Sequence, residues 1–104
     1  TWQVPFWWNR FLDDPEYVSL LKERWAILRS GILSEDIVLG RLRELQENLK
    51  GSSAIDKNFG KWLILGKYIW PNKFIGDIYD SEINYLEEWI SERFNWLDQN
   101  INEL

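Results

Sequence analysis

The chain has 104 residues and a net charge of −5, and its 12 Lys and Arg residues are dispersed along it. This balance excludes the basic footprint of a nucleic-acid-binding protein and gives no attraction to an anionic membrane surface. Cys and His are both absent, which excludes disulfides, thiol nucleophiles, and the commonest zinc ligand and general base.

A single domain of this length can bury a real core, but its aromatic content is unusual. The chain contains 8 Trp, 4 Tyr and 5 Phe within a hydrophobic fraction of 45%. No apolar run reaches the roughly 18 residues of a membrane span, so we expect no membrane insertion. Methionine is absent and the chain opens at Thr1, and we therefore expect an excised part of a longer protein.

Helix signals begin at the amino terminus. Aromatic residues at helical spacing around Pro5 predict a short helix within residues 2–12. Asp14 followed by Pro15 is a strong start signal, and it predicts a helix over residues 15–30. The expected inner face of this helix comprises Val18, Leu21, Trp25 and Leu28.

Two more helices are predicted in the middle of the chain. A serine and two acidic residues at 34–36 predict the start of a helix that ends at Gly51. Within it, Arg43 and Glu47 lie one turn apart and are expected to pair. Gly40 costs this helix about 1 kcal/mol relative to Ala, and we interpret it as a tolerated defect rather than a close helix approach. The third helix is expected to be capped by Ser52 or Ser53 and to reach about Leu65.

Residues 66–79 have no sustained period and contain Pro71, which predicts a loop. Since 14 residues without regular structure is long for a compact domain, we expect the loop to be packed down. The side chains expected to pack it are Ile69, Trp70, Phe74 and Tyr79.

The last stretch predicts a long helix capped by Asp80 or Ser81. Tyr85, Trp89 and Trp96 form a second apolar stripe on this helix, roughly 120° from the core-facing one. A helix that is apolar over about half its circumference must be covered from two directions, by two helices of its own domain or by one helix and something outside this chain. The core-facing stripe comprises Ile83, Leu86, Ile90, Phe94, Leu97, Ile101 and Leu104.

The sequence contains no recognisable catalytic, phosphate-binding or metal-binding motif. The acidic pairs at 13–14, 35–36 and 87–88 are explained better by helix starts and a polar helix face than by metal binding or acid/base work. The glycines match no phosphate-binding loop, and no His can activate Ser52 or Ser53. We therefore predict no catalytic, cofactor-binding or metal-binding residue in this chain.

Aromatic side chains are the remaining candidates for interaction. Arg93 lies between Trp89 and Trp96 and is expected to stack on Trp89, either as a ligand platform or, as we favour, as a helix-packing contact with a snorkelling Arg. Trp25 and Trp62 lie on predicted core faces. The tryptophans in irregular or terminal segments are the best candidates for exposure to a glycan or protein ligand, and they are Trp2, Trp7, Trp8 and Trp70.

Four motifs occur in order: the run WNRFLDDPEYVSLLKERWAILR at residues 8–29, Asn58-Phe59-x-x-Trp62, Trp70-Pro71-Asn72, and Leu86-x-x-Trp89-x-x-x-Arg93-x-x-Trp96-Leu97-Asp98. Together they resemble the C-terminal part of the CotH kinase-like family, the spore coat protein H group. The resemblance implies an atypical kinase-like parent that uses ATP and Mg²⁺ to phosphorylate partner proteins. The family's nucleotide and metal residues lie upstream of the matching region, so none is carried over to this chain.

The sequence thus predicts an all-α compact bundle of about four main helices, with a short N-terminal helix and a packed loop at 66–79. We expect a non-catalytic helical segment whose partner is the remainder of a CotH-like parent chain. Many relatives in the resembled family are exported bacterial surface or envelope proteins, so such a location is expected by resemblance. The alternative is a stand-alone Trp-rich module that binds glycan or protein.

Overall fold

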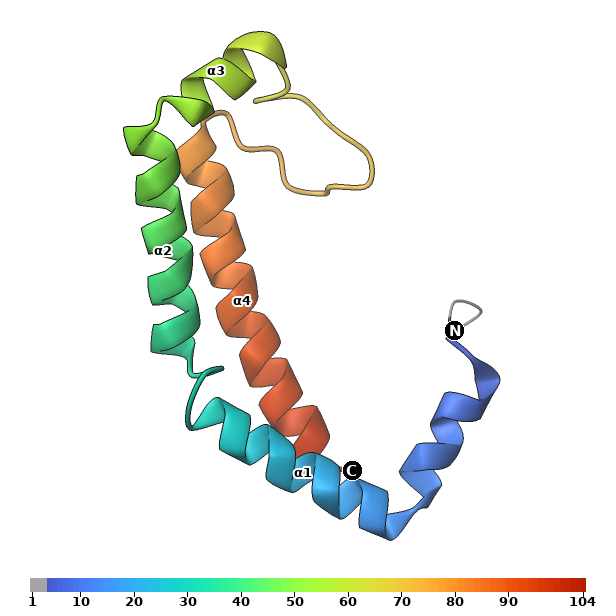
Figure 1. Ribbon diagram of the computed structural model, residues 1–104. Coiled ribbons are helices and arrows are strands. Elements are labelled where there is room, and N and C mark those ends of the chain that lie inside the picture. The colour runs from blue at the N-terminus through green and yellow to red at the C-terminus, as the bar shows by residue number, and fades with distance from the viewer. Residues whose placement is uncertain (1–3) are drawn as a thin grey trace.

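The computed structural model describes residues 4–104, which form five helices and no strand (Figure 1). The all-α prediction, with four main helices and a short N-terminal one, is confirmed. The short helix η1 is a 3-10 helix. In chain order the elements are η1 (Phe6–Asp13), α1 (Pro15–Arg29), α2 (Glu35–Gly51), α3 (Ala54–Lys61) and α4 (Tyr79–Asn102).

Helix α1 begins at Pro15, directly after the predicted cap residue Asp14. The Asp14 carboxylate accepts hydrogen bonds from the backbone N–H groups of Glu16, at 2.9 Å, and Tyr17, at 3.4 Å. These bonds satisfy N–H groups that have no partner inside the helix. Helix α2 likewise follows Ser34, although the Ser34 side chain makes no capping hydrogen bond.

Two predicted boundaries are wrong. Helix α3 ends at Lys61 rather than near Leu65, because Trp62 already has an extended backbone conformation. Trp62 is therefore 59% exposed and does not lie in a core. Helix α4 is preceded by Ile78, not capped by Asp80 or Ser81. The Ser81 hydroxyl instead accepts from the Ile78 N–H and donates to the Ile78 carbonyl oxygen, so it fixes the chain just before the helix.

The segment between α3 and α4 is an irregular loop closed at its base. The Gly66 N–H donates to the Gly76 carbonyl oxygen at 2.9 Å, and Gly66 has the left-handed φ of 72° that glycine adopts without strain. The Phe74 ring stacks on Tyr85 of α4 with centroids 4.3 Å apart. Phe74 and Tyr79 thus pack as predicted, whereas Ile69 is 42% and Trp70 81% exposed, so the prediction that these two hold the loop down is wrong.

Helices α2 and α4 lie side by side and antiparallel, and α1 crosses the carboxyl end of α4 (Figure 1). Helix η1 projects from the start of α1, so the described residues form an open arc. The radius of gyration is 18.3 Å, against about 13 Å for a compact domain of this length. Among residues 4–104 no hydrophobic side chain is fully buried. The arc therefore closes no core of its own.

A row of polar contacts joins α4 to α1 and α2, and we call it the polar seam. Its α4 members recur at steps of 7, 4 and 7, which keeps them on one side of a helix. Arg43 on α2 bonds Glu87 through both carboxylate oxygens, at 2.9 and 3.1 Å, so the predicted pairing of Arg43 with Glu47 is wrong. The α4 members of the polar seam and their partners are Asp80 with Gln46 and Lys50, Glu87 with Arg43, Ser91 with Glu35, and Asp98 with Trp25 and Arg29.

Candidate interaction surface

The polar seam is strongest where α1 crosses α4. The Arg29 guanidinium donates to both carboxylate oxygens of Asp98, at 3.0 Å each, and the Trp25 indole N–H donates to the same carboxylate at 2.8 Å. Arg29 also donates to the Leu33 carbonyl oxygen and lies 4.2 Å above the Phe94 ring. The Arg29 hydrogen bonds, helped by Trp25, hold the pKa of the Asp98 carboxyl below its usual value. This cluster fixes the angle between the two helices.

The polar seam occupies one side of α4, and the two apolar stripes of the helix lie on its other sides. The core-facing stripe of α4 is mostly half-buried against α1 and α2. The second stripe is open along most of its length: the Phe74 ring of the loop stacks on Tyr85, which remains 40% exposed, and Trp89 and Trp96 are each 50% exposed. The helices of this chain therefore cover α4 from one direction only.

Arg93 belongs to this open side of α4. Its guanidinium carbon lies 4.4 Å from the centroid of the Trp96 ring, so it stacks on Trp96 rather than on Trp89 as the sequence predicted. Both Trp89, four positions earlier, and Trp96, three positions later, are surface neighbours of Arg93 on a helix. Trp89, Arg93 and Trp96 thus form one exposed aromatic and cationic surface.

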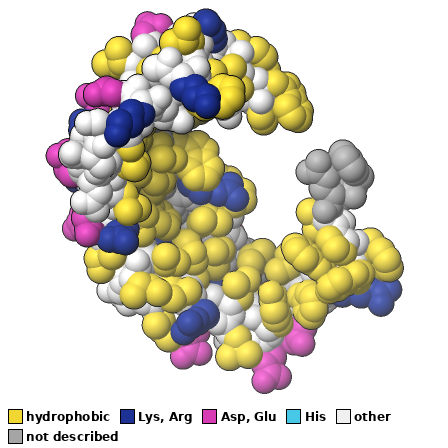
Figure 2. Space-filling view, turned by 45° about the horizontal axis from the view of Figure 1, so that its top comes forward, with side chains coloured by type: hydrophobic (Ala, Val, Ile, Leu, Met, Phe, Trp, Pro, Cys, Tyr) yellow, Lys and Arg dark blue, Asp and Glu magenta, His cyan; other side chains and the backbone are white. Residues whose placement is uncertain are grey.

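The space-filling view shows where hydrophobic side chains gather on the arc. Hydrophobic side chains fill the inner side of the arc, whereas Asp and Glu side chains lie along its outer contour (Figure 2). A soluble monomer rarely leaves a large contiguous apolar patch exposed. The inner side of the arc is therefore the principal candidate for an interaction surface, and we call it the inner face.

The tryptophans predicted to be exposed lie apart from α4. Trp7 and Trp8 on η1 are both exposed, with ring centroids 6.0 Å apart, and Trp7 contacts Phe11 edge-on at 5.9 Å. Trp70 lies in the loop, and Trp2 lies outside the described residues. The predicted site residues thus fall in three places, on α4, on η1 and in the loop, and the structure does not gather them into one site.

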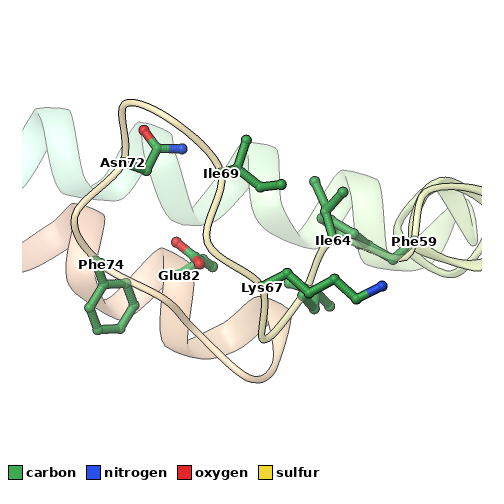
Figure 3. Close-up of a pocket in the computed structure, with 8 residues that line it drawn as sticks. Phe59, Ile64, Lys67, Ile69, Asn72, Phe74 and Glu82 are labelled. Atoms are coloured by element: carbon green, nitrogen blue, oxygen red, sulfur yellow. The ribbon is translucent and has the colours of Figure 1, made fainter.

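A small pocket under the loop was not foreseen from the sequence. It has a volume of about 240 Å³, and Glu82 points into it from the first turns of α4 (Figure 3). The Glu82 carboxylate accepts a hydrogen bond of 2.8 Å from the Gly76 N–H, so one of its oxygens is already engaged in holding the loop. Lys67 extends away from the carboxylate. The lining residues are Phe59, Ile64, Leu65, Lys67, Ile69, Asn72, Phe74 and Glu82.

Two further searches concern metals and membranes. Within residues 4–104 no three carboxylates come close enough together to hold a metal ion. In the same part of the chain, none of the helices combines the length and apolar character needed to cross a bilayer.

The geometry can be set beside known proteins. A model of the family described as CotH kinase protein matches residues 1–97, which reach from the amino terminus into the last turns of α4. No curated protein and no solved structure matches the chain. The family match spans all four motifs on which the resemblance was based, except for Asp98 at the end of the last one.

Proposed function

The chain belongs to the CotH kinase family, and we propose that it is a non-catalytic helical segment whose inner face packs onto the kinase-like lobe of the same protein and stabilises that lobe. The observation that carries the proposal is the open apolar arc. A helical chain with caps, polar contacts and a defined shape, yet with no fully buried hydrophobic side chain in residues 4–104, is suited to cover another body.

The surface area supports a large partner. The chain exposes 8588 Å², whereas a compact monomer of its mass exposes about 6,200 Å². A partner that covered this excess of about 2,400 Å² would bury a similar area of its own. The total of about 4,800 Å² lies within the roughly 2,000–5,000 Å² that permanent interfaces bury. A small ligand could not remove that much surface from water. A lobe of the same polypeptide could, because it is always present and needs no separate association step.

Catalysis is assigned to the lobe and not to this chain. ATP and Mg²⁺ are implied for the parent by the family, but the described residues hold neither a glycine-rich phosphate loop nor a grouping of three carboxylates. We therefore give no residue of this chain a role toward ATP or Mg²⁺. Phosphotransfer assays on the full-length protein and on this chain should find the activity only in the former.

The test is made in the full-length protein with the double variant Trp89→Ala and Trp96→Ala. Truncating two aromatic side chains at the centre of an interface costs about 2 kcal/mol or more each. We expect the lobe to unfold at a lower temperature and its phosphotransfer activity to fall with it. The matched control is Glu88→Ala with Asn95→Ala, on the exposed polar side of α4. Equal unfolding temperatures for both double variants would contradict the proposal.

A second candidate is a recognition module for glycan or protein, and it rests on Trp70. This side chain is 81% exposed in the loop beside the pocket that Asn72 and Lys67 line. An exposed indole can stack on a sugar ring or anchor a peptide. Tryptophan fluorescence titrated with cell-wall and dietary polysaccharides should shift in the wild type and not in Trp70→Ala. If no polysaccharide shifts the fluorescence, the hypothesis of glycan binding is wrong.

A further inference from the structure

Arg93 occupies the middle of the apolar half of α4. Because each residue turns the helix by about 100°, Trp89 and Leu97 lie about 40° from Arg93 on opposite sides. Residues three and four positions away are the surface neighbours of a helical side chain. For Arg93 these four neighbours are Trp89, Ile90, Trp96 and Leu97, and all of them are apolar.

No acidic partner reaches Arg93 within the part of the chain that the structure describes. Three other basic side chains at the boundary of α4 each have one: Arg29 with Asp98, Arg43 with Glu87, and Lys50 with Asp80. Arg93 has only the face of the Trp96 ring, at 4.4 Å. Stacking leaves the N–H donors in the plane of the guanidinium free, because the ring occupies only the space above that plane.

A partner that covers the inner face would remove water from the Arg93 guanidinium. A guanidinium at the rim of an apolar patch can snorkel to water, but one in the middle of the patch is flanked by apolar side chains on both sides. Burying it without a partner would cost several kcal/mol. The surface that covers α4 must therefore supply acceptors, and a carboxylate matches the planar fork of a guanidinium with two parallel hydrogen bonds.

We propose that the kinase-like lobe presents an Asp or Glu side chain to Arg93, within an otherwise apolar contact to Trp89 and Trp96. This inference rests on the proposed function and adds the chemistry of the partner surface. One ion pair inside an apolar interface fixes the register of docking, since every shifted arrangement leaves a charge buried and unpaired. Arg93 is the positive charge that this side of α4 offers to such a carboxylate, because Arg29, Arg43 and Lys50 already pair with acidic side chains of α4.

The first experiment locates the carboxylate. In the full-length protein, Arg93→Lys keeps the charge and introduces an amine that a zero-length carbodiimide joins to a carboxylate in contact. Mass spectrometry of the digested product should find this crosslink to one Asp or Glu of the lobe. Arg41→Lys is the matched control, because Arg41 lies exposed on α2 and pairs with Glu44 of its own helix. A crosslink from position 93 to a second copy of this chain, or no crosslink, would overturn the inference.

The second experiment measures the contact. Hydrogen exchange of the α4 amides in the full-length protein reports how often α4 opens away from the lobe. Arg93→Leu leaves the lobe's carboxylate unpaired, so we expect exchange through opening to become about 30-fold faster, and faster still for Arg93→Glu. Arg93→Lys should fall between the wild type and Arg93→Leu.

The two proposals fail in different ways. If exchange in Arg93→Leu is unchanged or slower while Trp89→Ala with Trp96→Ala accelerates it, the covering surface is wholly apolar. That result overturns the inference about the carboxylate and leaves the proposed function standing. If none of these variants changes exchange in α4, no lobe covers the helix and both proposals are overturned.

Discussion

The two sides of α4 differ in what they contact. The polar seam, from Asp80 to Asp98, joins α4 to α1 and α2 through ion pairs and hydrogen bonds. The opposite side carries Trp89 and Trp96, and nothing in the described chain covers it fully. In most helical bundles the apolar stripe faces the neighbouring helices and the charges face water. Here polar contacts join the helices beside a half-buried apolar stripe, and the second stripe with Trp89 and Trp96 remains available to a partner.

The difference has an energetic consequence. Exposed ion pairs contribute about 0–1 kcal/mol each, whereas burying a large aromatic side chain contributes about 1.5–3 kcal/mol. The polar seam therefore gives the arc its shape with little stability, and most of the stabilising free energy comes from the covered inner face. Substitutions in the polar seam and on the inner face should consequently have separable effects.

The largest effect within the polar seam is expected at Arg29. Arg29→Ala removes three hydrogen bonds to Asp98, one to the Leu33 carbonyl oxygen, and the stacking on Phe94. We expect a loss of about 2 kcal/mol, because Asp98 is left with only the Trp25 N–H. Hydrogen exchange of α1 amides in the full-length protein measures it. Arg41→Ala, at an exposed pair, is the control and should change exchange little. If Arg29→Ala and Arg41→Ala change the exchange of α1 amides equally, the contacts of Arg29 with Asp98 do not stabilise the junction of α1 and α4.

The contribution of Asp98 to the stability of this junction is expected to depend on pH. The pKa of Asp98 is lower in the folded chain, so the unfolded chain binds more protons at acid pH. The stabilisation is complete above the unfolded pKa of about 4 and is lost as the pH falls through the lower folded pKa. The difference in unfolding free energy between the wild type and Asp98→Asn should therefore shrink on acidification below that value. A difference independent of pH would exclude an ionised Asp98 from the junction.

Substitution of Gly40 is expected to raise the stability of the protein, whereas the substitutions in the polar seam lower it. A Cβ at this position meets no atom within 4 Å, which agrees with the interpretation of Gly40 as a tolerated defect. Gly40→Ala should stabilise α2 by about 1 kcal/mol through the unfolded chain and helix propensity. Slower hydrogen exchange across α2 would confirm it. Destabilisation in the full-length protein would instead place the partner surface against Gly40 and extend the covered region to α2.

The smallest effect is expected at the pair of Arg43 and Glu87. Both oxygens of the carboxylate are engaged, but the Arg43 side chain is 59% exposed, so solvent screens the interaction. A double-mutant cycle of Arg43→Ala and Glu87→Ala should give only a weak coupling that decreases further as salt is added. The cycle is read from urea unfolding of the full-length protein at low and high salt. A coupling of several kcal/mol would mean that the polar seam, rather than the inner face, stabilises the arc.

Local signals allowed the helices to be predicted, because caps and glycine stops act through neighbouring residues. Asp14 with Pro15 placed the start of α1, and Gly51 placed the end of α2. The end of α3 was missed because apolar spacing continued through Trp62 after the backbone had turned. Periodicity records which side chains are apolar, and it does not record where the backbone leaves the helix.

The polar seam could not be predicted in the same way. Glu87 and Asp98 have the spacing of a solvent-facing side, and only the position of α2 and α1 turns them into partners of Arg43 and Arg29. Arg43 had an acid one turn away in Glu47, so local pairing was the simpler expectation. The sequence predicted that the apolar half of α4 needs cover from two directions, but it left open whether the second cover comes from this chain. The structure leaves Trp89 and Trp96 half exposed.

The central claim is that the kinase-like lobe covers the inner face, and oxidative footprinting of tryptophan in the full-length protein tests it most directly. Trp89 and Trp96 are each half exposed in this chain, so their labelling rates before and after unfolding in urea measure any added cover. We predict that folding slows the labelling of both far more than their exposure in the isolated arc allows. Labelling that matches half exposure would contradict the claim, because it would show that nothing lies on this side of α4.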